Sequence, residues 1–174
     1  MNGIEQLVIG TMLGVGGIVV QPLPEDLKSE AVECLALNMY HEARGQGTAG
    51  ELAVTTVVMN RVNDSRFPNT ICGVVKQGPT RPSWKDPKIL FPIKHKCQFS
   101  WYCDGLSDKP RDNHAWLDAL NRTLSALHLY DTGFDISHGS THYHSKNVKP
   151  YWSTTIEYIT TIDDHHFYKW GQPG

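Results

Sequence analysis

Glu42 is the residue of this 174-residue chain whose type and position best fit a chemical role. Apolar residues precede it at the spacing of one helix face: Val32, Leu35 and Met39. Glu42 comes three residues after Met39, so it continues this stripe and its carboxyl group is expected to lose part of its hydration. Loss of hydration raises a carboxyl pKa toward the range that a general acid needs. The alternative is a structural helix-end carboxylate that pairs with Arg44 or His41.

Cleavage of a glycosidic bond is a reaction that such an acid performs, usually together with a second carboxylate. The weaker candidates for that partner are Glu51, Asp104 and Asp112. We expect Glu51 to be occupied by a helix cap and Asp104 by a turn. A lytic transglycosylase needs no second carboxylate, because the 6-hydroxyl of the sugar itself attacks the anomeric carbon. With one outstanding carboxylate, the sequence favours a transglycosylase that leaves 1,6-anhydro ends over a hydrolase.

Histidines raise a rival hypothesis, a zinc-dependent amidase or peptidase. The chain has nine of them, including two close pairs: His142 with His144, and His165 with His166. The run that starts at His41 begins like the HExxH zinc motif, but Gly45 stands where the second histidine is required. We therefore expect neither a metal nor another cofactor. A third hypothesis is a non-enzymatic binding or structural module that keeps the groove without the acid, which the presence of Glu42 disfavours.

Composition excludes several other classes of protein. The net charge is −2, and the chain has neither a basic run that would track phosphate nor a GxxxxGK[ST] loop, so nucleic acid is not an expected partner. Charged residues make up 20% and aromatic residues 10%, which is typical of a soluble globular domain.

The elements that would position these residues are mostly helical. Long helices are predicted at residues 25–42, 48–62 and 113–130. The second helix starts with the pattern of a capping box, Thr48 to Glu51, and a short helix that ends at Val75 is capped by Asn69 or Thr70. Residues 78–92, rich in proline, are predicted to be a surface excursion, and residues 97–104 a strand or extended loop that lines a groove. Residues 154–162 and 165–170 predict a hairpin, so the fold class is α+β, mainly helical with a small antiparallel sheet near the C-terminus.

The N-terminal part differs in composition from the rest. Residues 7–20 carry no charge and are rich in glycine, but they are short for a membrane span. We interpret residues 1–23 as a segment and linker that acts as a signal-anchor, a virion-docking or partner-docking helix, or a helix buried in the domain. Residues 24–174 then form the catalytic domain.

Cysteine spacing predicts at least one disulfide. The chain has no CxxC motif, so a zinc ribbon is not expected. We predict one disulfide among Cys72, Cys97 and Cys103, provided that the protein works in an oxidising compartment, and interpret Cys34 as a small core side chain.

Ordered blocks of the sequence carry a family resemblance: residues 40–45 (YHEARG), 50–54 (GELAV), 58–62 (VMNRV), 67–75 (FPNTICGVV), 98–100 (QFS), 141–143 (THY) and 150–152 (PYW). They resemble a bacterial cell-wall hydrolase family that includes the spore-cortex-lytic enzymes and several phage endolysins. The resemblance implies a lysozyme-like fold that acts on peptidoglycan, with the glutamate of the EAR block, Glu42, as the acid. The insert at residues 78–92, the Cys97/Cys103 pair and the apolar N-terminal segment depart from the family pattern.

On this interpretation the substrate is the glycan strand of peptidoglycan, cut between MurNAc and GlcNAc. Gln98 and Ser100 are expected to hydrogen-bond an N-acetyl group, and His142 to orient the site. Flat faces for sugar rings are expected from Phe99, Trp101, Tyr143 and Trp152; the alternative for each aromatic is core packing, and for His142 a structural role. We expect a phage endolysin or virion-associated lysin that acts on the cell wall, in the periplasm or outside the cell. Residues 7–20 are expected to deliver it or to make transient contact with a membrane or a virion.

Overall fold

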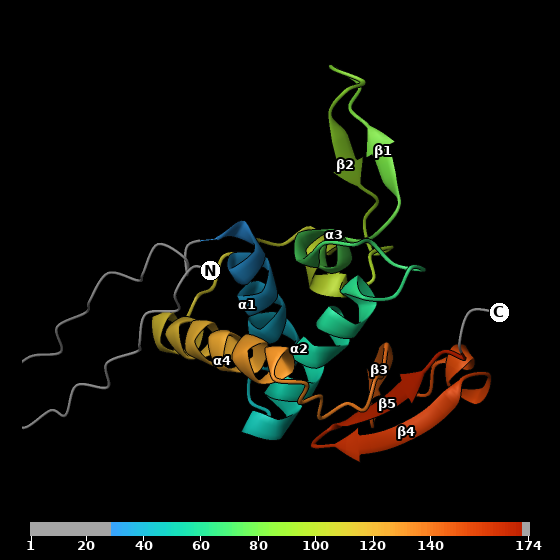
Figure 1. Cartoon of the computed structure of the whole chain (residues 1–174). Helices are drawn as coiled ribbons and strands as arrows, with labels where there is room; N and C mark the ends of the chain where they lie inside the picture. Colours follow the sequence, from blue (N-terminus) through green and yellow to red (C-terminus); the bar gives the residue numbers. More distant parts are fainter. Residues whose placement is uncertain (1–28, 172–174) are drawn as a thin grey trace, which may run out of the picture.

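Helices pack together on one side of the molecule and an antiparallel sheet lies beside them (Figure 1). The computed structural model describes residues 29–171. The helices are α1 (Glu30–Ala43), α2 (Thr48–Val62), α3 (Ile71–Val75) and α4 (Asn113–Asp131), and α1 contacts the other three. The sheet contains β3 (His142–Ser145), β4 (Glu157–Ile162) and β5 (His165–Lys169) in the order β3-β5-β4. The predicted fold class, α+β and mainly helical, is confirmed.

Helix α1 is the buried element that the apolar stripe predicted. Val32, Leu35 and Met39 are at most 7% exposed. The helix begins at Glu30 and not at residue 25, because Ser29 is extended and its hydroxyl caps the helix by accepting from the Val32 N–H at 3.3 Å. Arg44 and Gly45 end it, with Gly45 at φ +90°, a conformation that glycine adopts without strain.

Helix α2 has the predicted bounds but a different cap. Its N-cap is Gly47, and the side chain of Glu51 binds Arg122 of α4 at 2.6 Å, so the predicted capping box is wrong. Asp163, in the turn between β4 and β5, accepts a hydrogen bond from the Gly50 N–H at 2.9 Å instead. A Cβ at Gly50 would lie 2.7 Å from that carboxylate, so the close approach requires glycine.

The proline-rich insert lies at the surface as predicted, and it has the additional order of a two-stranded hairpin. Strands β1 (Thr80–Pro82) and β2 (Leu90–Pro92) pair antiparallel, and Figure 1 shows the hairpin projecting away from the helices and from the sheet. The following segment is neither a strand nor an extended loop, because η2 (Ser100–Cys103) is a turn of 3₁₀ helix. Another 3₁₀ turn, η3 (Tyr151–Thr154), precedes the predicted C-terminal hairpin, which is confirmed as β4 and β5.

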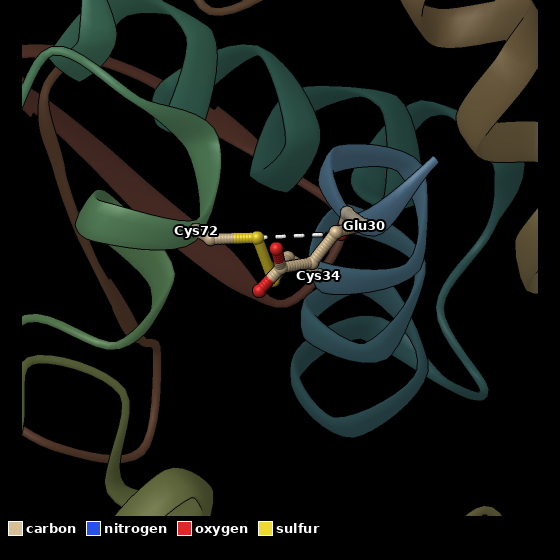
Figure 2. Close-up of side chains that lie close together, drawn as sticks. All are labelled: Glu30, Cys34 and Cys72. Atoms are coloured by element: carbon tan, nitrogen blue, oxygen red, sulfur yellow. Dashed lines mark hydrogen bonds between the residues drawn. A yellow bond between two sulfur atoms is a disulfide. The ribbon is translucent and has the colours of Figure 1, made fainter. Parts of the chain in front are cut away.

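Two disulfides tie the helical part together. Cys34 bonds to Cys72, which fastens α1 to α3 (Figure 2), and Cys97 bonds to Cys103 across η2. The prediction of a disulfide among the last three cysteines is confirmed by Cys97–Cys103. The interpretation of Cys34 as an unpaired core side chain is wrong, because α3 packs against α1 and brings Cys72 to Cys34.

No helix within residues 29–171 is long and apolar enough to cross a membrane. The predicted docking or anchor segment at residues 7–20 lies outside the described residues.

Candidate active site

A pocket of about 230 Å³ forms where the C-terminal end of α1 faces β3. Glu42 reaches it from the last turn of α1, Arg61 from the last turn of α2, and His142, Tyr143 and His144 from the edge strand β3. The rest of its lining comes from the loop before η2 and from η3 with its preceding residue: Gln98, Phe99, Pro150 and Trp152. Five predicted substrate-binding residues therefore share one pocket with Glu42: Gln98, Phe99, His142, Tyr143 and Trp152.

The carboxylate of Glu42 has one hydrogen-bond donor in the described chain. The Tyr143 hydroxyl donates to Glu42 Oε2 at 3.1 Å. Burial raises the pKa of Glu42, while the hydrogen bond from Tyr143 and the positive charge of Arg61 oppose part of that rise. The predicted alternative, a pair with Arg44 or His41, is not formed, since Arg44 donates to the Tyr40 hydroxyl and His41 Nε2 contacts the Asp108 carbonyl.

Arg61 is the pocket residue to which the sequence interpretation gave no role. It is 5% exposed, and its Nε donates to the Thr141 carbonyl at 2.6 Å. Its guanidinium carbon lies 5.2 Å from the ring centre of Phe67 and 5.4 Å from that of Phe99. Within residues 29–171, Arg61 Nη1 has no hydrogen-bond partner. A signal was available, because Arg61 follows the buried Val57 and Val58 at helical spacing, as Glu42 follows Met39.

His142, one of the two histidines that line the pocket, is neutral at physiological pH. Burial, together with the charges of Arg61 and Arg66, lowers the pKa of His142 to about 4. Its Nδ1 lies 3.0 Å from the Thr141 hydroxyl, and its ring centre lies 5.5 Å from that of Trp152. A neutral imidazole beside an indole ring offers a polar edge and a flat face, the combination that sugars use.

Two predicted substrate-binding residues lie outside this pocket. Ser100 is exposed at the start of η2. Trp101 is 9% exposed, donates from Nε1 to Asn38 Oδ1 at 3.2 Å and stacks on His41 at a ring distance of 4.6 Å, so it lines a separate hollow. In an extended segment Phe99 and Trp101, two residues apart, would face the same side, but the 3₁₀ turn that begins at Ser100 breaks this alternation.

The three weaker carboxylates also lie elsewhere. Glu51 binds Arg122, and Asp112 accepts from the His114 and Ala115 N–H groups as the N-cap of α4. Asp104 accepts from the Leu106 N–H in a turn, as expected, and lines the hollow beside Trp101. Among the described residues that line the Glu42 pocket, Glu42 is the sole carboxylate.

One histidine of each pair is hydrogen-bonded to a hydroxyl of the sheet. His144 Nε2 lies 2.9 Å from the Tyr168 hydroxyl, and His166 Nδ1 lies 2.6 Å from the Thr161 hydroxyl. Within residues 29–171, one group of possible ligand side chains is close enough to share an ion: Glu30, Cys34 and Cys72. Figure 2 shows that its two sulfurs are bonded to each other, so it offers no thiolate.

Comparison with known proteins decides the family. The model of the Cell Wall Hydrolase family matches residues 45–168, well over half of the chain. The chain belongs to this family. The resemblance in the sequence blocks is thereby confirmed, although Glu42 lies three residues before the matched range.

Relatives and solved structures agree with this membership. The spore cortex-lytic enzyme of Oceanobacillus iheyensis is 28% identical over 155 residues, which cover 88% of this chain and 47% of the relative. That of Bacillus subtilis is 35% identical over 57 residues, or 33% of this chain and 19% of the relative. The match thus covers about half the length of the first relative and a smaller share of the second.

The fold of the family member is also shared with solved domains. The catalytic domain of the germination-specific lytic transglycosylase SleB from Bacillus anthracis superposes with a TM-score of 0.61 at 24% identity, over 84% of this chain and 100% of that one. The catalytic domain of Bacillus cereus SleB gives 0.57 at 26% identity, over 89% and 100%.

Proposed function

We propose that this cell-wall hydrolase family member is a lytic transglycosylase that cuts peptidoglycan glycan strands between MurNAc and GlcNAc, with Glu42 as its acid and base. The observation that carries the proposal is the isolation of Glu42. It is the one carboxylate among the described lining residues of its pocket, and burial raises its pKa. The name of the Bacillus anthracis structural neighbour, a lytic transglycosylase, agrees with this chemistry.

The reaction begins with a proton on Glu42. The raised pKa keeps this proton in place until it passes to the glycosidic oxygen, and the bond between that oxygen and the anomeric carbon breaks. The 6-hydroxyl of the same sugar forms the new bond to the anomeric carbon and returns its proton to the Glu42 carboxylate. No water is consumed, and the product is a 1,6-anhydro end.

Between these two transfers Glu42 carries a negative charge, and its neighbours stabilise that state. The Tyr143 hydroxyl donates to the carboxylate at 3.1 Å, and the charge of Arg61 favours the ionised form. Burial favours the protonated form and is the larger effect on the pKa of Glu42, while these two groups favour the ionised form that the second proton transfer requires.

The remaining pocket residues suit a sugar. Gln98 offers an exposed amide to the N-acetyl group, and His142 and Trp152 form one wall. Ser100 and Trp101 are outside the pocket, so we assign the substrate contacts to Gln98, Phe99, His142, Tyr143 and Trp152, and add Arg61 as a positioning residue.

The second candidate is a hydrolase of the muramidase type. It would require a second carboxylate as nucleophile or as base for water. Glu51, Asp104 and Asp112 are each held by other partners, so the geometry favours the transglycosylase.

We further propose that the enzyme acts outside the cytoplasm, because its two disulfides persist in oxidising compartments. The ideas of a phage endolysin and of delivery through residues 7–20 remain predictions from the sequence. Residues 24–174 are proposed as the catalytic domain.

Product analysis tests the proposal. Purified peptidoglycan is digested to completion, treated with borohydride and analysed by mass spectrometry. Anhydro ends resist reduction and are lighter than hydrolysed ends by one water, so we expect unreduced anhydromuramic ends. Reducible muramic ends would overturn the transglycosylase and support the hydrolase. Loss of lysis in chelator would instead support the zinc-dependent class.

The role of Glu42 is tested with Glu42→Gln, which keeps the size of the side chain but removes the transferable proton. We expect wall lysis to fall about a hundredfold or more. Asp104→Asn is the matched control and should keep its activity, since Asp104 lies in the other hollow. A folded Glu42→Gln variant with near wild-type activity would remove Glu42 from the mechanism.

A further inference from the structure

The hairpin of β1 and β2 exposes a cluster of large apolar side chains. We call residues 78–96 the arm. At and near its tip, Trp84 is 86% exposed, Leu90 59%, Ile89 50% and Phe91 49%. Figure 1 shows the arm standing away from the helices, so these side chains have no part in the core. Single exposed apolar residues are ordinary on a protein surface, but four within eight positions of one projecting hairpin form a patch.

The same arm concentrates positive charge. It holds one carboxylate, Asp86, against five cationic side chains: Arg81, Lys85, Lys88, Lys94 and Lys96. The whole chain has a net charge of −2, so the arm is a basic segment on a protein whose remainder is acidic. The described ion pairs of residues 29–171 include none of these five side chains. Their charge is therefore free to attract an anionic surface.

Apolar and cationic side chains lie next to each other at two points of the arm. Arg81 lies opposite Phe91 in the strand pairing, and the Lys85 ammonium lies 5.1 Å from the Trp84 ring centre. Together with Ser83 these four residues line a hollow of about 400 Å³. None of them lines the Glu42 pocket, so a partner held by the arm leaves the pocket open.

We propose that the arm docks the protein on the surface of an anionic phospholipid bilayer. Tryptophan and lysine are the residue types that anchor proteins at the interface between lipid and water. Ile89 and Leu90 favour a bilayer over a soluble polyanion. A polyanion binds cationic side chains, but it offers exposed aliphatic side chains no apolar surroundings. Lipid covers those groups while its phosphates meet the lysines.

The docking would hold the pocket beside the membrane-facing layer of the wall. It is independent of the chemistry proposed for Glu42 and also of residues 7–20, which lie outside the described chain. Binding to vesicles therefore tests the arm without any measurement of lysis.

The test is sedimentation of the full-length protein with vesicles of phosphatidylglycerol and phosphatidylcholine, compared with vesicles of phosphatidylcholine alone. One variant removes the aliphatic pair, Ile89→Ser with Leu90→Ser, and a second removes two charges, Lys85→Gln with Lys88→Gln. Each has a matched control elsewhere on the surface. Phe134→Ser with Val148→Ser removes two exposed apolar side chains, and Lys76→Gln with Lys146→Gln removes two surface charges.

We expect the protein to bind the anionic vesicles and to bind neutral vesicles at least tenfold more weakly. The charge variant should bind anionic vesicles about 30-fold more weakly, which corresponds to about 1 kcal/mol for each cation near the surface. The aliphatic variant should weaken binding by at least tenfold, and both controls should bind like the wild type.

Three results would overturn the proposal. Equal binding by the arm variants and their controls would assign any vesicle binding to another segment, such as residues 7–20. An aliphatic variant that binds as well as the wild type, with strong retention of inorganic polyphosphate, would show a site for soluble polyanions. Failure of the wild type to bind anionic vesicles would exclude membrane docking altogether. Each variant's thermal melting is compared with that of the wild type, and the exposure of all the changed side chains predicts unchanged folds.

Discussion

Removal of one hydroxyl group from the pocket should shift the pH range of the enzyme. In Tyr143→Phe, the Glu42 carboxylate loses the donor that lies 3.1 Å from its Oε2 and keeps its burial. A hydrogen bond to a charged group contributes about 1.5–3 kcal/mol. The bond favours the ionised form, so its loss raises the pKa of Glu42 further.

The alkaline limb of the pH profile should report this rise. Glu42 must be protonated to start the reaction, so kcat/KM falls as pH rises through the pKa of Glu42. In Tyr143→Phe we expect that limb to move to higher pH, because the raised pKa keeps the acid form present over a wider range. The maximal rate should fall at least tenfold, because the ionised intermediate loses a stabilising contact.

Turbidity clearing of purified walls across the pH range measures both effects. Tyr158→Phe is the matched control, since Tyr158 lies on β4 and its hydroxyl contacts Thr161. An alkaline limb that stays in place, or that moves down, would refute the argument that Tyr143 tunes the acid. Circular dichroism spectra identical to the wild type are required before either result counts.

Three further predictions concern stability and domain organisation. Replacement of the Cys34–Cys72 disulfide by alanines should lower the free energy of unfolding by about 4 kcal/mol, and replacement of Cys97–Cys103 by about 2 kcal/mol. The difference arises because the disulfides close loops of 38 and 6 residues. Denaturant titration measures both losses, and equal losses would contradict the loop-entropy reasoning. Asp163→Ala should lower the free energy of unfolding by about 1 kcal/mol, because the Gly50 N–H of α2 loses its acceptor. Asp163→Asn keeps an acceptor oxygen and should recover most of this stability. Equal melting temperatures of the alanine variant and the wild type would show that the contact is not a cap. Deletion of residues 1–22 should leave a folded, active enzyme, because residues 29–171 contain their own hydrophobic clusters; loss of the cooperative melt would instead show a core helix among the deleted residues.

Local patterns predicted the parts of the fold that local forces determine. The stripe that leads to Glu42 follows from helical periodicity, and Asp163 with Asp164 marked the turn of the C-terminal hairpin. Thr70 caps α3 as predicted, by accepting from the Gly73 N–H at 3.1 Å. Each of these signals involves residues that are close in the sequence.

Contacts between distant residues account for the errors. Thr48 and Glu51 had the pattern of a capping box, but Arg122 binds Glu51 and Asp163 supplies the cap from 113 positions away. Cys34 had the spacing of a core residue and its partner lay on another helix.

The candidate site shows the same division. Glu42 and Tyr143 lie 101 residues apart, and only their family blocks linked them before the hydroxyl contact was seen. Arg61 had a readable signal, a lone cation on an apolar helix face, that the sequence interpretation did not use. Trp101 is the opposite case, a residue that was assigned to the groove and lies outside it. Its position next to groove residues in the sequence does not indicate on which side its ring lies.

The central position of β5 in its sheet determines when the candidate site can form during synthesis. Strand β3, which carries Tyr143, joins the sheet through β5, and β5 ends at Lys169. A chain still attached to the ribosome at an earlier residue holds Glu42 but has no partner strand to fix Tyr143 beside it. On the proposed chemistry the acid is therefore tuned only after β5 has emerged and joined the sheet.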